Sequence, residues 1–225
     1  MNRPEPFTKS FQDYDWPECK KLYIGASGCG KTTLCWEHAF KKEKARVKFI
    51  FDHKAMEFSR RYLHTLPVFW PDEMDKLVAQ GGTVCFSPSK MFPGRPDEGF
   101  DYFCEYVFEA SQLFRGRKLL ICDELQKLVG TSSKPDQLVN ICDIGRTFQI
   151  DCFFIASASN AIHNLVLGQM TEAYCFRHGH DRACQWEVDN NFDKEELLAL
   201  KKGMWLWRNL YKGGDTKRGG KEIPD

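Results

Sequence analysis

Short apolar runs alternate along the chain with longer segments in which apolar residues recur at helical spacing. The apolar runs cover 22–24, 47–52, 83–87, 119–122, 151–156, 173–176 and 204–207, and the helical segments cover 32–42, 71–80, 100–114, 136–146 and 194–201. Short apolar runs bounded by polar or turn residues are typical of strands buried on both faces. Strands that alternate with helices favour βαβ units. We therefore expect an α/β fold with a doubly wound, mainly parallel sheet.

The most regular helical pattern runs from Phe100 to Phe114. Its apolar stripe consists of Phe100, Phe103, Val107, Ala110 and Phe114, with acidic and polar residues between them. Residues three and four positions apart lie on one face of a helix, so we expect this stripe to face the core. Pro71 stands at the first position of another predicted helix, which the Gly81–Gly82 pair ends.

Breaks in the pattern divide the chain. Proline and glycine are frequent in 88–99, which we expect to form a loop, whereas 125–130 begins a helix. We predict an N-terminal arm over residues 1–19, one domain over 20–211 and a flexible tail rich in glycine and lysine over 212–225.

The segment from Gly25 to Thr32 fits the pattern G-x-x-x-x-G-K-[ST] of a phosphate-binding P-loop. It lies between a predicted strand and a predicted helix, which is the context that this motif requires. Small residues allow backbone N–H groups to close around phosphate oxygens, and the following helix adds the positive end of its dipole. We expect Lys31 to reach the β- and γ-phosphates. The predicted nucleotide-binding residues are Gly25, Ala26, Ser27, Gly28, Cys29, Gly30, Lys31, Thr32 and Thr33.

A second nucleotide-site signature follows about ninety residues later. Four apolar residues, 119–122, lead into Asp123 and Glu124, which is the Walker B pattern. A buried strand would carry these acids to the carboxyl edge of the sheet, where α/β proteins place their sites. We expect Thr32 and Asp123 to hold Mg²⁺ and Glu124 to deprotonate the attacking water.

Composition and charge narrow the class of protein. The chain has 225 residues, of which 42% are hydrophobic, and 32 Lys and Arg balance 31 Asp and Glu. A nucleic-acid site would therefore be a local basic patch or one assembled from several subunits. No apolar run approaches the length of a membrane span, and the first residues contain no signal-peptide core. We expect an intracellular protein.

The ten cysteines show no paired C-x-x-C framework, so we expect reduced, mostly buried thiols. Cys175, His178, His180 and Cys184 stand close together in the sequence, but their spacing matches no familiar structural zinc site. A strand that ends in a polar turn is the interpretation we favour there.

Taken in order, these motifs resemble the FtsK–HerA superfamily of DNA pumps. The order is a P-loop, two further strands, Asp123-Glu124, a helix that closes in Gly145-Arg146-Thr147, and a strand that ends in small polar residues. The short single domain resembles the viral branch, the genome-packaging ATPases of tailless, membrane-containing phages and related viruses. The resemblance covers roughly residues 20–210, and 143–159 is the part that points to this superfamily.

The resemblance implies a P-loop NTPase with a catalytic glutamate and a RecA-like fold, and it implies roles for particular residues. Lys31 and Glu124 match the catalytic lysine and glutamate. Arg146 matches an arginine that lies near a subunit boundary in such pumps, where it would act as an arginine finger. The family's sensor strand usually ends in Thr-Gln, whereas Ser157-Ala158 stands here. We predict that Ser157 takes the role of the sensor, the polar group beside the γ-phosphate, with Ser159 and Asn160 as alternatives.

The implied function is ATP-driven, Mg²⁺-dependent transport of double-stranded DNA into a virion by a ring, hexameric in our prediction. Capsid or procapsid vertex proteins would be its partners, and host cytoplasm or the packaging vertex of the virion its location. Loops near 53–61 and 158–170 are candidates for contact with DNA. Three alternatives remain open: a Zot-type filamentous phage assembly ATPase, which normally has a membrane-spanning segment, a small-molecule or nucleotide kinase, and a nucleotide-dependent structural protein.

Overall fold

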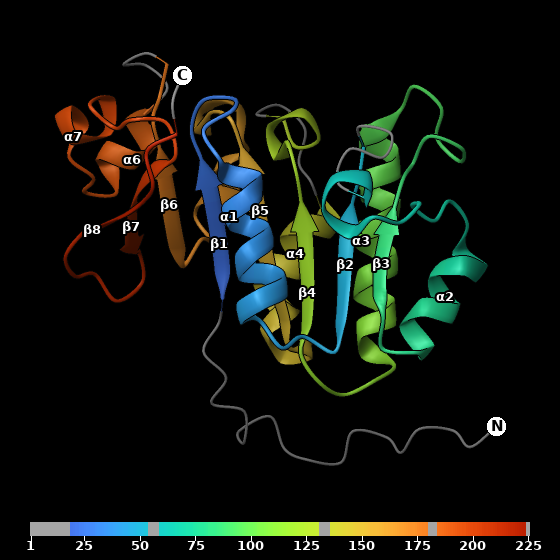
Figure 1. Ribbon diagram of the computed structural model, residues 1–225. Helices are drawn as coiled ribbons and strands as arrows, with labels where there is room; N and C mark the ends of the chain where they lie inside the picture. The colour runs from blue at the N-terminus through green and yellow to red at the C-terminus, as the bar shows by residue number, and fades with distance from the viewer. Residues whose placement is uncertain (1–18, 54–58, 131–135, 180–183, 224–225) are drawn as a thin grey trace.

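An eight-stranded sheet forms the centre of the protein, which a computed structural model describes over residues 19–53, 59–130, 136–179 and 184–223. The predicted N-terminal arm lies outside these residues except for Cys19. The strand order is β3-β2-β4-β5-β1-β6-β7-β8 (Figure 1). The strands are β1 (Lys20–Ile24), β2 (Val47–Phe51), β3 (Thr83–Phe86), β4 (Lys118–Cys122), β5 (Ile150–Ala156), β6 (Glu172–Phe176), β7 (Met204–Asn209) and β8 (Lys217–Gly220).

Strands β1 to β6 pair in parallel with one another, whereas β7 and β8 extend the sheet in antiparallel fashion. The prediction of a mainly parallel α/β sheet is confirmed. In a parallel sheet all carboxyl ends meet at one edge, and the register pairs Ile24 with Ala156 and Cys122 with Phe154. The ends of β1, β4 and β5 therefore lie next to one another.

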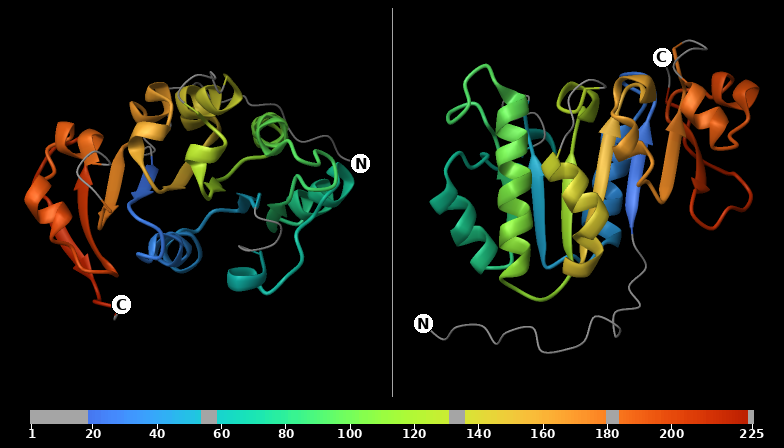
Figure 2. Two further views of the ribbon diagram at one scale, coloured as in Figure 1. Left: turned by 90° about the horizontal axis from the view of Figure 1, so that it is seen from above. Right: turned by 180° about the vertical axis from the view of Figure 1, so that it is seen from behind.

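Helices cover both faces of the parallel part (Figure 2). Helix α1 (Lys31–Glu37) lies on one face, and α3 (Pro96–Gln112), α4 (Asp136–Ile144) and α5 (Asn164–Leu167) lie on the other. Helix α2 (Pro71–Ala79) lies near β3, and α6 (Gln185–Asp189) and α7 (Lys194–Leu198) lie near the antiparallel strands. None of the helices in the described part of the chain has the length and apolar character needed to cross a bilayer.

Two hydrophobic clusters, one on each face, explain why the central strands are apolar throughout. Leu22 and Ile24 of β1 belong to the cluster under α3 and α4, whereas Tyr23 between them belongs to the cluster under α1. Alternate side chains of a strand point to opposite faces, and both faces are covered here. Every residue of β5 is consequently buried.

Several element boundaries differ from those predicted. Helix α3 begins at Pro96, inside the predicted loop 88–99, because the fixed φ of proline suits the first position of a helix. The predicted helix over 32–42 consists of α1 and a π-helical turn, His38–Lys42. Residues 125–130 form only a 3₁₀ turn, Leu125–Lys127, rather than a helix.

The C-terminal segment is more ordered than the sequence indicates. We expected a flexible tail from Lys212 on, but β8 pairs with β7 through this segment. A Cβ on Gly219 would come within 2.4 Å of the Trp205 ring. The glycines of this segment therefore allow β8 to approach β7 closely, and their frequency does not signal disorder.

Candidate active site

The P-loop lies at the carboxyl end of β1, between the ends of β5 and β6. Gly25, Gly28 and Gly30 have φ values of 144°, 75° and 95°. Residues that carry a side chain rarely adopt such φ values, so glycine is favoured at these positions. A Cβ on Gly25 would also lie 2.8 Å from the Cβ of Phe176. The Ala26 N–H donates to the Arg177 carbonyl at 2.8 Å, so the loop is anchored to the end of β6.

The lysine of the motif lies within the loop. Lys31 is buried, and its Nζ donates to the Ala26 carbonyl at 2.7 Å. The amine is therefore held over the backbone that would surround the phosphates. Cys29 in the same loop is also buried, with its thiol 3.9 Å from the Ser27 carbonyl oxygen and 3.8 Å from that of Arg177.

The structure brings the two predicted metal ligands together. The Thr32 hydroxyl donates to Asp123 Oδ2 at 3.4 Å, across the gap between the loops that follow β1 and β4. Asp123 Oδ1 accepts the Glu124 N–H at 2.8 Å, which fixes the orientation of this carboxylate. Hydroxyl and carboxylate oxygens are ligands that Mg²⁺ prefers, with water and phosphate oxygens completing its shell. The donor set therefore fits the ion.

Glu124 has an unusual backbone and a well-held side chain. Its φ of 55° and ψ of 41° place it in the left-handed region, which costs free energy for a residue other than glycine. Its Oε2 accepts from Gln126 Nε2 at 3.0 Å and from Lys127 Nζ at 3.1 Å. The predicted catalytic carboxylate is thus held next to Asp123, one of the two predicted Mg²⁺ ligands.

The three candidate sensor residues occupy different environments. Ser157 lies at the end of β5, and its Oγ accepts from Gln126 Nε2 at 2.8 Å. Ser159 is buried and donates instead to Glu187 Oε2 at 3.2 Å, and Asn160 is exposed. Of the three, Ser157 has a hydrogen bond to the residue that also contacts Glu124. Sequence reasoning did not identify Gln126, although its position two residues after the acid pair was the available signal.

A buried polar pair, His178 and Glu187, lies just after β6. His178 directly follows Arg177, whose carbonyl anchors the P-loop. Glu187 Oε1 lies 3.4 Å from His178 Nε2, and burial raises the pKa of the Glu187 carboxyl to about 7. Among the described residues, no group of three or more His, Cys, Asp and Glu side chains is arranged to hold a metal ion. His180, which we considered with these residues, lies outside the described part of the chain. All ten cysteines are buried with free thiols, as the sequence predicts.

Arg146 lies far from the P-loop of its own chain. It is exposed in a 3₁₀ turn, Gly145–Phe148, which comes directly before β5 and therefore lies at the amino edge of the sheet. The seven residues of β5 separate this turn from Ser157, which corresponds to about 20 Å. The geometry therefore leaves no role for Arg146 at a nucleotide bound to the P-loop of its own chain.

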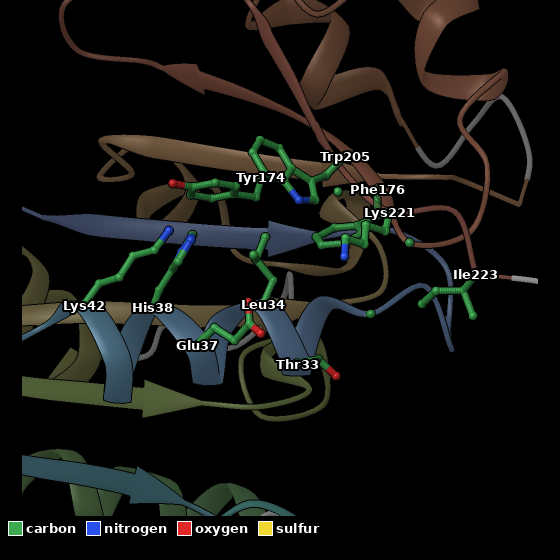
Figure 3. A pocket seen from close by; sticks show the side chains of 13 residues that line it. Thr33, Leu34, Glu37, His38, Lys42, Tyr174, Phe176, Trp205, Lys221 and Ile223 are labelled. Atoms are coloured by element: carbon green, nitrogen blue, oxygen red, sulfur yellow. The ribbon is translucent and has the colours of Figure 1, made fainter.

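A groove of about 650 Å³ runs along α1 from the P-loop (Figure 3). Its volume is in the range of small-molecule sites. Figure 3 shows α1 on one side and Tyr174, Phe176 and Trp205 on the other, with Ile223 near the P-loop. The lining residues are Gly30, Thr33, Leu34, Glu37, His38, Lys42, Tyr174, Phe176, Gly203, Trp205, Gly220, Lys221 and Ile223.

One of the two candidate DNA-contacting loops touches the P-loop helix. The turn Ser59–Leu63 carries exposed Arg60 and Arg61, and the Tyr62 hydroxyl lies 3.2 Å from the Thr33 hydroxyl. The other candidate, 158–170, begins at the carboxyl end of β5. The first loop follows β2 at the same edge of the sheet as the P-loop, and its residues 54–58 lie outside the description. The second begins at that edge and leads through α5 back to the amino end of β6.

No protein-family model matches the sequence, and no curated protein matches it either. Solved structures do match the fold. The genome-packaging NTPase B204 from Sulfolobus turreted icosahedral virus 2, in complex with AMPPCP, is 15% identical, covers 92% of this chain and 99% of its own, and superimposes with a TM-score of 0.72. B204, the DNA-packaging ATPase from Sulfolobus turreted icosahedral virus, is 16% identical over 92% of this chain and 99% of its own, with a TM-score of 0.64.

A bacterial ATPase shares the fold more distantly. The cytoplasmic domain of the Type VII secretion ATPase EccC from Thermomonospora curvata is 12% identical, with a TM-score of 0.51, and the match spans 92% of this chain and 24% of that one. At sequence identities this low, the likeness shows a shared fold and nothing about activity. The chain has the fold of a P-loop NTPase, and the viral genome-packaging NTPase B204 is among its structural neighbours.

Proposed function

We propose that this protein is an ATP-hydrolysing motor that moves double-stranded viral DNA into a capsid. The observation that carries the catalytic part is the convergence of three loops at one edge of the sheet. The P-loop with Lys31, the acids Asp123 and Glu124, and Ser157 come from adjacent strands, and Thr32 lies 3.4 Å from Asp123. This is the set of groups that hydrolysis of a nucleoside triphosphate requires.

In the proposed reaction, Glu124 accepts a proton from a water molecule as that water attacks the γ-phosphorus. The bond from the γ-phosphorus to the bridging oxygen breaks, and ADP and phosphate are released. Lys31 and the P-loop N–H groups would stabilise the charge that develops on the phosphate oxygens. Thr32 and Asp123 would hold Mg²⁺, which neutralises phosphate charge when bound. The groove along α1 would take the base and ribose, since it opens at Gly30 and Thr33.

The packaging role is supported by the extent of the likeness to B204. The match spans 92% of this chain and 99% of the B204 chain, so nearly every part of B204 has a structural counterpart here. The balanced charge of the chain fits a ring in which only the lumen is basic. We propose a homo-oligomeric ring, hexameric in the simplest case, that acts at a capsid or procapsid vertex in the host cytoplasm or in the virion.

The test measures ATP hydrolysis of the purified protein with and without duplex DNA, together with its particle size in solution with and without nucleotide. We expect free phosphate as the product, stimulation by duplex DNA and a nucleotide-dependent oligomer. Lys31→Ala, which removes the phosphate-binding amine, is the control for contaminating ATPases. If neither duplex DNA nor oligomerisation changed the rate of ATP hydrolysis, the proposed motor function would be contradicted. The proposed ATPase activity would still stand.

Product analysis separates this proposal from the kinase alternative. A kinase transfers the phosphoryl group to a bound acceptor and does not need Glu124 to activate water. A phosphorylated acceptor in place of free phosphate would therefore contradict the proposed hydrolysis.

A further inference from the structure

One side chain joins the ends of the two central strands beside the expected position of the γ-phosphate. Gln126 lies in the turn after β4, and its Nε2 donates to Glu124 Oε2 at 3.0 Å and to Ser157 Oγ at 2.8 Å. Its Oε1 accepts the Ser157 N–H at 3.2 Å. We infer that Gln126 is a positioning residue that orients the base Glu124 and couples it to Ser157. This inference rests on the proposed ATPase function.

The hydrogen-bond partners fix the orientation of the amide. A glutamine side chain offers two N–H donors and one carbonyl acceptor. In the observed orientation, both donors face oxygen atoms and the carbonyl faces an N–H. Exchanging the amide N and O would place the Gln126 oxygen against the Glu124 carboxylate and its NH₂ group against the Ser157 N–H. The network therefore accepts the side chain in one orientation only.

This arrangement determines what the Ser157 hydroxyl can do. A hydroxyl has one proton to donate, and Ser157 Oγ already accepts a hydrogen bond from Gln126. Its own proton is therefore directed away from Gln126, toward another acceptor. Ser157 follows β5, the strand between β4 and β1, so a γ-phosphate oxygen on the P-loop is the acceptor expected when nucleotide is bound.

The same amide limits rotation of the catalytic carboxylate. Glu124 Oε2 accepts from both Gln126 and Lys127. Lys127 is 56% exposed, and ion pairs at such positions contribute little because solvent screens them. Gln126 is less exposed and is anchored at a second point, Ser157. It therefore constrains the direction of the base more firmly than Lys127 does.

The contact is not needed to hold the sheet together. Strand β4 pairs with β5 along its whole length, from Lys118 with Ile150 to Cys122 with Phe154. Loss of the Gln126 amide should consequently affect the chemical step more than the fold. A misplaced catalytic group can cost on the order of 100-fold in rate.

The first test compares Gln126→Ala with wild type in steady-state ATP hydrolysis and in equilibrium binding of a fluorescent ATP analogue. We expect kcat to fall about 10- to 100-fold while the dissociation constant changes less than about twofold. Gln185→Ala is the matched control, since Gln185 Nε2 donates to the Asp189 carboxylate at 2.8 Å on the exposed surface of α6. That variant should retain the wild-type kcat.

A second variant distinguishes positioning from a structural role. Gln126→Glu places a carboxylate next to Glu124, and a neighbouring like charge raises the pKa of a carboxyl group. The acidic limb of the kcat–pH profile should therefore move to higher pH by about one unit. A residue that only supports the fold would lower activity equally at all pH values.

A double-mutant cycle tests the coupling to Ser157. If Gln126 and Ser157 act as one unit, Ser157→Ala combined with Gln126→Ala should lower kcat no further than the more severe single variant. Multiplicative losses would contradict the coupling.

The outcomes separate this inference from the function on which it rests. Absence of ATP hydrolysis by the wild-type protein would overturn the proposed function. Normal hydrolysis by wild type together with unchanged kcat and pH profiles in the Gln126 variants would overturn the inference alone. Should Gln126→Ala fail to fold, Gln126→Met keeps the side-chain length without the amide. Unfolding of both variants would show a structural role and would also overturn the inference.

Discussion

At the residue scale, Glu124 combines a left-handed backbone with a side chain that Gln126 and Lys127 hold in place. Its left-handed backbone turns the chain sharply after β4 and places the carboxylate next to Asp123 without moving that residue from the strand end. The sequence predicts the acid pair and its edge of the sheet. It does not predict the left-handed turn at Glu124. It does not predict the contact of Gln126 with Ser157 either, because Ser157 is 31 residues away in the sequence.

Replacing this carboxylate tests its proposed role. Glu124→Gln keeps the shape of the side chain but removes the proton acceptor, so we expect hydrolysis to fall by a factor of about 100 or more while ATP binding is retained. Phosphate release and equilibrium nucleotide binding are the measurements. Glu105→Gln, on the exposed face of α3, serves as the control. A rate near that of wild type would place the base elsewhere.

His38 is a second residue whose environment leads to a prediction. Its Nδ1 lies 2.7 Å from the Tyr23 hydroxyl, and burial lowers its pKa from 6.5 to about 3. Between these values the unfolded chain binds a proton that the folded protein does not bind. This contribution to stability is therefore complete above about pH 6.5 and decreases as the pH falls toward 3.

The measurement is the free energy of unfolding in urea at several pH values between 7 and 4.5. Wild type should lose stability on acidification by up to about 1.4 kcal/mol per pH unit more than His38→Gln. The raised pKa values of Asp151 and Glu187 act in the opposite direction, but they do so in both proteins and cancel in the comparison. Equal slopes for wild type and His38→Gln would contradict the prediction.

At the scale of elements, the apolar runs predict strands β1 to β7. The parallel strands give a strong apolar signal because both of their faces are covered, and the half-buried β7 gives one through Trp205, Leu206 and Trp207. Helix α6 was not predicted, since Gln185–Asp189 is short and mixed in composition. Strand β8, Lys-Arg-Gly-Gly, resembles a flexible tail in composition. Its pairing depends on close approach to β7 and Trp205, which no local pattern encodes.

The close approach of β8 to β7 can be tested at Gly219. In Gly219→Val the new side chain would meet the Trp205 ring, so β8 should be displaced and one wall of the groove along α1 loosened. We expect faster tryptic cleavage at Lys217 and Arg218 and weaker nucleotide binding. Gly179→Val is the control, because a Cβ there meets no atom within 4 Å. Unchanged cleavage and binding would show that β8 tolerates the extra volume.

At the scale of the whole molecule, the distance between Arg146 and the P-loop leaves action across a subunit boundary as the remaining finger hypothesis. An arginine finger contributes roughly 10³–10⁵ in rate where it has been studied. If Arg146 acts in trans, Arg146→Ala should bind ATP and be nearly inactive alone. Mixed with Glu124→Gln, it should recover some activity, because its own Glu124 can use Arg146 of the neighbouring subunit.

Phosphate release by the separate variants and by their mixture is the measurement, with subunit exchange followed by fluorescence transfer. A fully active Arg146→Ala protein would eliminate the finger. Inactive mixtures with demonstrated exchange would contradict a site completed by Arg146 from a neighbouring subunit. Glu124→Gln mixed with wild type gives the baseline for passive dilution.

The two ends of the described chain lie at opposite edges of the sheet. Cys19 precedes β1 at the amino edge, whereas Ile223 lines the groove beside the P-loop (Figure 1). An affinity tag or fluorophore fused at the N-terminal side would enter the described fold a full strand away from the P-loop. One fused at the C-terminal side would follow Ile223, which lines the groove beside the P-loop. Reporter fusions for these assays should therefore carry their labels at the N-terminus, because a label that follows Ile223 would compete for the groove in which we propose that nucleotide binds.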